Sequence, residues 1–143
     1  AVATPFSAHH WRQMDAAIRQ LHRVLKPGGR AVFADTIAPA DPLCDTWLQS
    51  IDLLRDVSHV RNASLGEWIS RLDAAGFALE NIVTARLPLV FDAWIARTQP
   101  PAAHVAPIRS LQATASAEIK THFALADDGS FTIDTAVLLA TKR

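Results

Sequence analysis

The sequence is poor in cysteine, glycine and tyrosine: its 143 residues include one cysteine, five glycines and no tyrosine. A single cysteine, Cys44, cannot form a disulfide within the chain. A chain without internal disulfides is consistent with the reducing cytoplasm. No apolar run approaches the ~20 residues of a membrane-spanning helix. The chain opens on Ala1, and no secretory signal pattern follows. We therefore expect a cytoplasmic protein with no membrane partner.

An excess of charge of either sign is also absent. The 14 basic and 14 acidic residues give a formal net charge of zero. Nucleic acids and anionic membranes attract proteins through basic surfaces, so neither is expected as the main partner. The 50% hydrophobic and 20% charged residues are typical of an ordinary globular domain, and the length suits one hydrophobic core.

The motifs of hydrolases and metalloenzymes are missing as well. The sequence contains no G-x-S-x-G, no H-E-x-x-H and no spaced set of cysteines and histidines. His9 and His10 are neighbours, so they do not share a helix face, and no third ligand accompanies them. We expect no metal site.

One helix–strand unit organises the chain. Apolar residues recur with helical spacing from Met14 to Leu25, which predicts a helix packed on a core. Lys26-Pro27-Gly28-Gly29 ends that helix, because proline cannot continue the hydrogen-bond ladder and glycine accepts a left-handed cap. The apolar run at 31–34 then predicts a buried strand, as in a parallel sheet.

The other patterns predict further elements: a strand at 1–5, helices at 42–55 and 65–76, a strand from 79 that ends before Pro88, a helix at 91–97, helical pieces within 102–123, and a strand at 131–139. Asp41 and Pro42 are a typical helix start, and Ser64 with Glu67 forms a capping-box pattern. The first of the two long helices is expected to bury Leu43, Trp47, Ile51 and Leu54. The second is expected to bury Leu65, Trp68, Ile69 and Leu72.

Three strings carry a family resemblance: FSAHHW at 6–11, LHRVLKPGGRAVFAD at 21–35 and RDVSHVRNASLGEWISRLDAAGF at 55–77. Together they resemble class I S-adenosylmethionine-dependent methyltransferases of the ubiquinone/menaquinone-type small-molecule branch. The resemblance implies an α/β fold, the C-terminal half of a Rossmann-like sheet. About four strands are expected, the last one antiparallel, with a helical insertion at about 91–123 before it.

The glycine-rich cofactor turn of that family is not found in this chain. None of the five glycines lies in a G-x-G arrangement after a strand, although close backbone approach to a cofactor requires glycine. We therefore expect residues 1–143 to form a single partial methyltransferase domain without the N-terminal cofactor-binding half. An open strand edge and an uncovered apolar face would remain, so a homodimer that covers this face is expected.

The resemblance also implies where S-adenosylmethionine and the substrate would meet. The positions after the first strand line that crevice, which makes Phe6, Ser7, His9 and Trp11 candidate cofactor-binding residues and His10 a candidate base. Local packing and capping by the two histidines is the alternative.

Further candidates follow from position and residue type. Asp35 and Thr36 follow the buried strand, at the sheet edge where open α/β proteins bind ligands, so they are candidate substrate-binding residues. A local cap or turn bond made by Asp35 is the alternative. In the polar loop at 55–61, Arg55 and Arg61 could bind an acidic substrate and His59 could accept a proton. A solvated loop held by an Arg–Asp pair explains the same residues.

Two functions remain open. The first is S-adenosylmethionine-dependent methyl transfer to a small molecule, with His10 or His59 as the base and with the fragment inactive alone. The second is a non-catalytic remnant that acts as a dimerisation or binding module. Calorimetric titration with S-adenosylhomocysteine would separate them.

Overall fold

The computed structural model describes all 143 residues, which divide into two compact units. Unit 1 comprises residues 1–37, 60–85 and 135–143, and unit 2 comprises residues 38–59 and 86–134. No helix in the chain combines the length and the apolar character that crossing a membrane requires.

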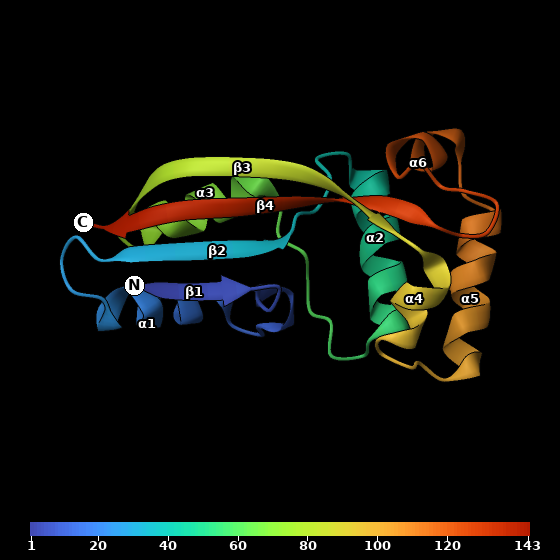
Figure 1. Ribbon diagram of the computed structural model, residues 1–143, viewed down its shortest axis with the longest axis horizontal. Coiled ribbons are helices and arrows are strands. Elements are labelled where there is room, and N and C mark those ends of the chain that lie inside the picture. Colours follow the sequence, from blue (N-terminus) through green and yellow to red (C-terminus); the bar gives the residue numbers. More distant parts are fainter. The chain divides into compact units, whose positions relative to one another are not determined.

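One four-stranded sheet runs through the chain (Figure 1). Its strands are β1 (Val2–Pro5), β2 (Arg30–Thr36), β3 (Phe77–Leu89) and β4 (Phe131–Lys142), in the order β1-β2-β4-β3. β1 pairs in parallel with β2, and β4 pairs antiparallel with β2. The predicted α/β class, with about four strands and an antiparallel last strand, is confirmed.

In unit 1, two helices cover one face of the sheet. α1 (Met14–Val24) and α3 (Leu65–Ala74) lie behind the strands in Figure 1. Their residues Ile18 and Leu72 are fully buried in one core with Phe33 of β2. The predicted stop after α1 is confirmed. Gly28 has φ +71° there, a backbone conformation that glycine adopts without steric cost.

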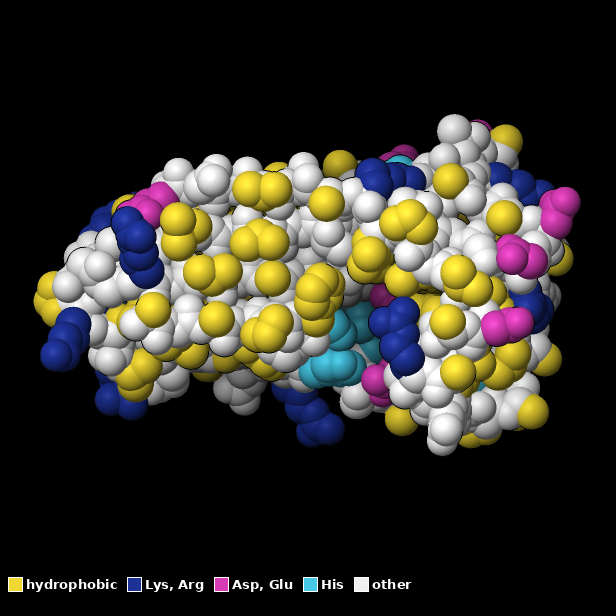
Figure 2. All heavy atoms as spheres, in the orientation of Figure 1, with side chains coloured by type: hydrophobic (Ala, Val, Ile, Leu, Met, Phe, Trp, Pro, Cys, Tyr) yellow, Lys and Arg dark blue, Asp and Glu magenta, His cyan; other side chains and the backbone are white.

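The opposite face of the sheet in unit 1 is apolar and uncovered. Strand alternation places Val32 and Ala34 on it, where they pair with Leu139 and Val137 of β4. Figure 2 shows hydrophobic side chains gathered over these strands. Val137 is 43% exposed, which is unusual for a valine in a central strand.

α3 begins as the sequence predicts. Ser64 Oγ accepts a hydrogen bond from Glu67 N at 3.2 Å, and Ser64 N donates to Glu67 Oε2 at 2.7 Å. Two backbone N–H groups at this helix start, those of Ser64 and Glu67, are therefore paired. The predicted burial of Ile69 is wrong, because it lies at the margin of the apolar stripe and is 40% exposed.

Unit 2 is mainly helical. It contains α2 (Pro42–Arg55), α4 (Phe91–Ala96), α5 (Ala102–Ala113) and α6 (Ala117–His122). An aromatic core joins these helices, with the rings of Trp47 and Phe123 4.7 Å apart and those of Trp94 and Phe131 5.0 Å apart. Helical structure was predicted at these positions and is confirmed.

Two details of the predictions in this part of the chain are wrong. Asp41 does cap α2, since its side chain accepts from Cys44 N at 2.9 Å. Leu43, however, is 50% exposed, and Cys44 and Leu48 are buried in its place. β3 also continues through Pro88. Because β3 is an edge strand, a missing N–H can face away from the sheet there without loss of a ladder bond.

Candidate functional site

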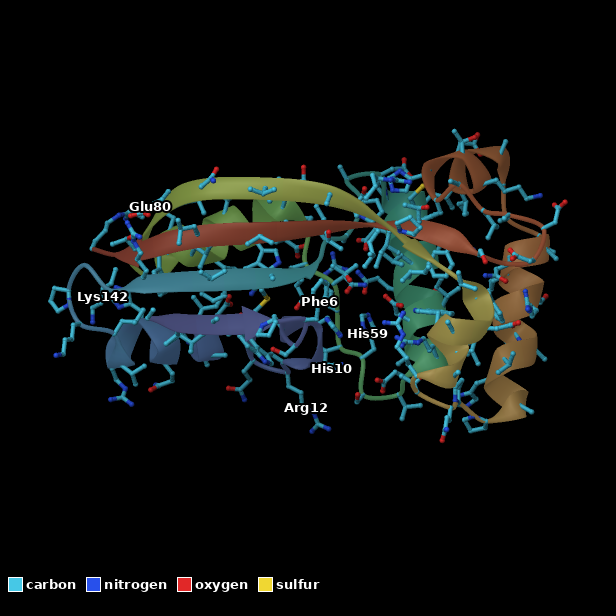
Figure 3. The ribbon with its side chains drawn as sticks, in the orientation of Figure 1. Phe6, His10, Arg12, His59, Glu80 and Lys142 are labelled. Atoms are coloured by element: carbon cyan, nitrogen blue, oxygen red, sulfur yellow. The ribbon has the colours of Figure 1, made fainter.

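The chain turns sharply where β1 ends. Phe6 has φ +44°, is 51% exposed, and donates its backbone N–H to Ala34 O at 2.7 Å. A positive φ is uncommon for a residue other than glycine and stores backbone strain. The turn leads into η1, a short 3₁₀ helix at Ala8–His10 that starts after Ser7. Figure 3 labels Phe6, His10 and, just beyond η1, Arg12.

Asp35, at the end of β2, holds η1 in place. Its carboxylate accepts hydrogen bonds from Ala8 N at 2.8 Å, from His9 N at 3.3 Å and from Thr36 N at 2.8 Å. Its Oδ1 also lies 2.6 Å from His9 Nδ1. Asp35 is 2% exposed and Thr36 is 8% exposed, so both are buried in the protein. The local bonds of Asp35 therefore satisfy both oxygens of its carboxylate.

η1 is fixed from its other side as well. His9 O accepts hydrogen bonds from Val60 N at 2.8 Å and from Arg61 N at 3.1 Å. The ring of His10 lies against the ring of His9, with 4.2 Å between their centroids. The segment before α3 and the end of β2 thus clamp the His9-His10 pair between them.

A groove of 390 Å³ opens in unit 1 beside η1. The start of α1, the segment at 60–63 and the start of α3 also line it. Its lining includes two large apolar side chains and four arginines, which are Trp11, Met14, Arg12, Arg19, Arg61 and Arg71.

Two of these arginines are paired with acids. Arg61 Nη2 lies 3.3 Å from Glu67 Oε2, and Arg71 pairs with Asp15. Burial alone would raise the pKa of Glu67, but the Ser64 N–H and the Arg61 guanidinium outweigh it and lower this pKa below 4.5. Arg12 and Arg19 stay exposed on the same groove. The groove therefore carries net positive charge although the whole chain has none.

The remaining two candidates lie in unit 2 and have partners there. His59 is 8% exposed, and its Nε2 lies 2.8 Å from Gln49 Oε1. Arg55 donates from Nε to Trp94 O at 2.9 Å and lies over the Trp94 ring, 4.8 Å from its centre. Burial lowers the pKa of Arg55, although the group stays charged.

The structure thus groups eight of the ten predicted site residues in unit 1 and two in unit 2. Those in unit 1 are Phe6, Ser7, His9, His10, Trp11, Asp35, Thr36 and Arg61. Their roles stay predictions. Sequence reasoning missed Arg12, Met14 and Arg19 as groove residues. The seven-residue spacing of the two arginines was a signal for them, which the balanced overall charge obscures.

No glycine loop of the kind that approaches a nucleotide closely accompanies these residues. Phe6 and Ser7 follow β1 at the edge where open α/β sheets bind ligands. No glycine follows β1 or β2 directly, since the five glycines lie in the α1–β2 turn, in or after α3, and before β4. No group of three or more acidic, histidine or cysteine residues could hold a metal ion.

Known proteins resemble this chain over nearly its whole length. A family model described as a methyltransferase domain matches residues 1–33. The uncharacterized protein YafE of Escherichia coli (strain K12) is 45% identical over 141 residues, which are 99% of this chain and 68% of YafE. The uncharacterized methyltransferase YcgJ of Bacillus subtilis (strain 168) is 40% identical over 97 residues, 68% of this chain and 38% of YcgJ. The crystal structure of YcgJ matches with a TM-score of 0.93 at 34% identity, covering 99% of this chain and 63% of that one. The chain belongs to the class I methyltransferase family.

This methyltransferase chain corresponds to the C-terminal portion of the family fold. It also matches protein BH2331 of Bacillus halodurans C-125 with a TM-score of 0.94 at 25% identity, covering 99% of this chain and 63% of that one. It therefore spans about two thirds of the length of these relatives. At the level of fold alone, phosphoethanolamine N-methyltransferase 2 of Haemonchus contortus, solved in complex with S-adenosyl-L-methionine, matches with a TM-score of 0.53 at 13% identity, over 98% of this chain and 32% of that one.

Proposed function

We propose that this chain takes part in S-adenosylmethionine-dependent methyl transfer to a small molecule in the cytoplasm. The observation that carries the proposal is the likeness to YcgJ, which is 40% identical over 68% of this chain and matches its backbone over 99% of it. An enzyme of this family acts mainly by positioning its reactants, because holding the methyl donor and the acceptor in line removes much of the activation barrier.

The groove of unit 1 is the proposed place for part of the acceptor. Its 390 Å³ fall within the roughly 300–1,000 Å³ typical of small-ligand pockets. Trp11 and Met14 offer apolar contact, and Arg12 and Arg19 offer positive charge. An acceptor with an apolar body and an acidic group would match both features.

These 143 residues by themselves are expected to bind the cofactor weakly or not at all. No glycine follows β1 or β2 to allow close approach of a nucleotide. Calorimetric titration of the chain with S-adenosylhomocysteine tests this point. Micromolar binding would contradict it.

The methyl transfer itself is tested with the complete reading frame that encodes these residues. The protein is incubated with methyl-labelled S-adenosylmethionine and a cell extract, and the label is then followed into small molecules, proteins, nucleic acids and lipids. We expect it in the small-molecule fraction, enriched among anionic compounds. Label only in macromolecules would overturn the proposal.

A double variant, Arg12→Glu with Arg19→Glu, tests the groove. Charge reversal at the groove should raise the acceptor KM at least tenfold. Arg30→Glu is the matched control, because Arg30 is exposed at the start of β2 and does not line the groove. An unchanged KM in the double variant would place the acceptor elsewhere.

A further inference from the structure

Two arginines in unit 2 lie over aromatic rings, but only one of them has an acidic partner. The Cζ atom of Arg109 lies 3.4 Å from the centre of the Phe91 ring, and its Nη2 lies 3.7 Å from Asp92 Oδ1. The Cζ atom of Arg55 lies 4.8 Å from the centre of the Trp94 ring, and Arg55 forms no ion pair. The chain therefore leaves the Arg55 guanidinium without an anion.

The Arg55 side chain is held in one orientation. Its Nε donates to Trp94 O at 2.9 Å, which uses one of the five N–H donors of a guanidinium. The four N–H groups on Nη1 and Nη2 have no acceptor in the protein. Arg55 is half-buried, and the Trp94 ring shields one face of its guanidinium from water. These donors therefore lack protein acceptors at a place where hydration is also incomplete.

The charges around Arg55 do not neutralise it. Burial lowers the pKa of Arg55 most, Asp52 and Asp56 oppose this effect, and the nearby charge of Arg97 lowers the pKa further. Neither aspartate forms an ion pair with Arg55. Arg97 lies at the C-cap of α4, is exposed, and has no ion-pair partner either. Two neighbouring cations of this kind attract an anion more strongly than one does.

A guanidinium fixed in this way suits an oxyanion. The donors on Nη1 and Nη2 form a planar fork that matches two oxygen atoms of a carboxylate or a phosphate. Because Trp94 already restricts the Arg55 side chain on two sides of its guanidinium, little rotamer freedom is lost when an anion binds. A lysine at this position would supply the charge but not the fork.

We propose that Arg55 is the centre of a binding site in unit 2 for a small anionic molecule with a carboxylate or phosphate group. The fork of Arg55 binds two oxygen atoms of that group, and Arg97 adds positive charge from the end of α4. Neither arginine lines the groove of unit 1, and binding here requires no methyl transfer. For a free inorganic anion, two charge-assisted hydrogen bonds lead us to expect a Kd on the order of 1 mM.

The first experiment needs no activity. The Nε–H signals of Arg55 and Arg109 and the indole N–H signal of Trp94 are followed by NMR in the complete protein. Sodium phosphate is added at constant ionic strength, and sodium acetate is added in a second titration. We expect saturable shifts at Arg55 and Trp94, half complete at about 1 mM anion, and none at Arg109.

The two titrations also identify the group that binds. Saturation by phosphate alone would assign the site to phosphate-bearing molecules, and saturation by acetate alone would assign it to carboxylates. Linear shifts of all three signals would show only a general effect of salt and would overturn the proposal. Unchanged Arg55 signals in both titrations would overturn it as well.

The second experiment separates the fork of Arg55 from its charge. Arg55→Lys should weaken anion binding about tenfold, because it keeps the charge but loses one of the two hydrogen bonds. Arg97→Gln should weaken it about threefold, the size expected of an exposed charge. Arg109→Lys is the matched control, since Arg109 also lies over a ring but is paired with Asp92. Equal affinity of Arg55→Lys and the wild type would refute the site.

Failure of this site and failure of the proposed function can be told apart. If the protein transfers methyl groups but Arg55 responds to neither anion, only the site is refuted. If no methyl group is transferred but the Arg55 shifts saturate, the site stands and the proposed function fails. Phosphate bound only in the groove of unit 1 would shift the Trp11 indole signal and leave Arg55 unchanged, which also refutes the site. Where Arg55→Lys fails to fold, as circular dichroism would report, the comparison of Arg55 with Arg109 in the wild type still decides.

Discussion

At the scale of single residues, one aromatic side chain lies at the centre of the hydrophobic core of unit 1. Phe33 is fully buried in β2, and its ring centroid lies 5.4 Å from that of Trp68 and 6.0 Å from that of Phe77. These contacts join the sheet to α3 and to the start of β3. Loss of the Phe33 side chain would therefore remove packing contacts between β2, α3 and β3 together.

Phe33→Ala is expected to lower the free energy of unfolding by about 3–5 kcal/mol, the usual range for a buried phenylalanine. Urea denaturation followed by circular dichroism measures it. Val24→Ala, at an α1 position that is 58% exposed, is the matched control and should change stability by less than about 0.5 kcal/mol. Equal effects of the two variants would refute this description of the core.

A second residue, Glu67, ties stability to pH. The pKa of Glu67 is lower in the folded chain than its ordinary value of 4.5. The stability that ionised Glu67 contributes is therefore fully present above pH 4.5, and it is lost as the pH falls through the folded-state pKa. Glu67→Gln should therefore flatten the decline of stability on acidification below about pH 5. Thermal unfolding at pH 7, 5 and 4 measures this, and parallel declines in both proteins would contradict it.

At the scale of elements, the glycine turns differ in what surrounds them. Gly129, before β4, has φ +88°, and an added Cβ would lie 2.6 Å from Gln112 Oε1 and against the Arg109 side chain. Gly28, before β2, has φ +71° but no atom within 4 Å of such a Cβ. A side chain at position 129 is therefore disfavoured by the surrounding atoms and by the backbone conformation. A side chain at position 28 is disfavoured by the backbone conformation alone.

Gly129→Ala should therefore destabilise the protein more than Gly28→Ala does. The Gly28 variant should cost about 1 kcal/mol, the usual cost of a left-handed conformation for a residue with a Cβ. The Gly129 variant should cost at least about 2 kcal/mol, because Gln112 would also have to give up its bond to Gly129 O. The difference in melting temperature between the two variants is the measurement, and the opposite order would contradict the expected packing.

The elements themselves could be predicted from the sequence, but their margins and their pairing could not. Helix starts at Asp41 and Ser64 depend on local hydrogen bonds, which the residue types reveal directly. Periodicity finds the centre of an apolar stripe but not its edge, which is why Leu43 and Ile69 were misplaced. The bond between Asp35 and His9 joins residues 26 positions apart. It depends on the register of β1 against β2, which no short pattern encodes.

At the scale of the whole molecule, the uncovered sheet face of unit 1 is the main surface to explain. Two cross-strand rows make it apolar: Ala3, Val32 and Leu139 form one, and Pro5, Ala34 and Val137 form the other. β1 adds an open edge. Exposed faces and edges of this kind favour association. We propose that a second copy of the chain covers this face.

The 143-residue chain is expected to sediment as a dimer at micromolar concentration in analytical ultracentrifugation. Val137→Glu should shift it toward monomer, because a carboxylate cannot be buried unpaired in an apolar interface. Val57→Glu, at a position 74% exposed in unit 2, is the control and should leave the dimer intact. A monomer in the wild-type chain would refute the proposal.

The strand order has a consequence for how the chain folds as it is made. β4 lies between β2 and β3, yet it is synthesised after all the other elements. At translation rates of about 5–20 residues per second, β3 waits about 3–10 seconds for its only partner strand. During that interval the ladder groups of β2 and β3 that later bind β4 stay unpaired. We therefore expect the nascent chain to depend most on chaperones in that interval, because unpaired strand edges can pair with other chains.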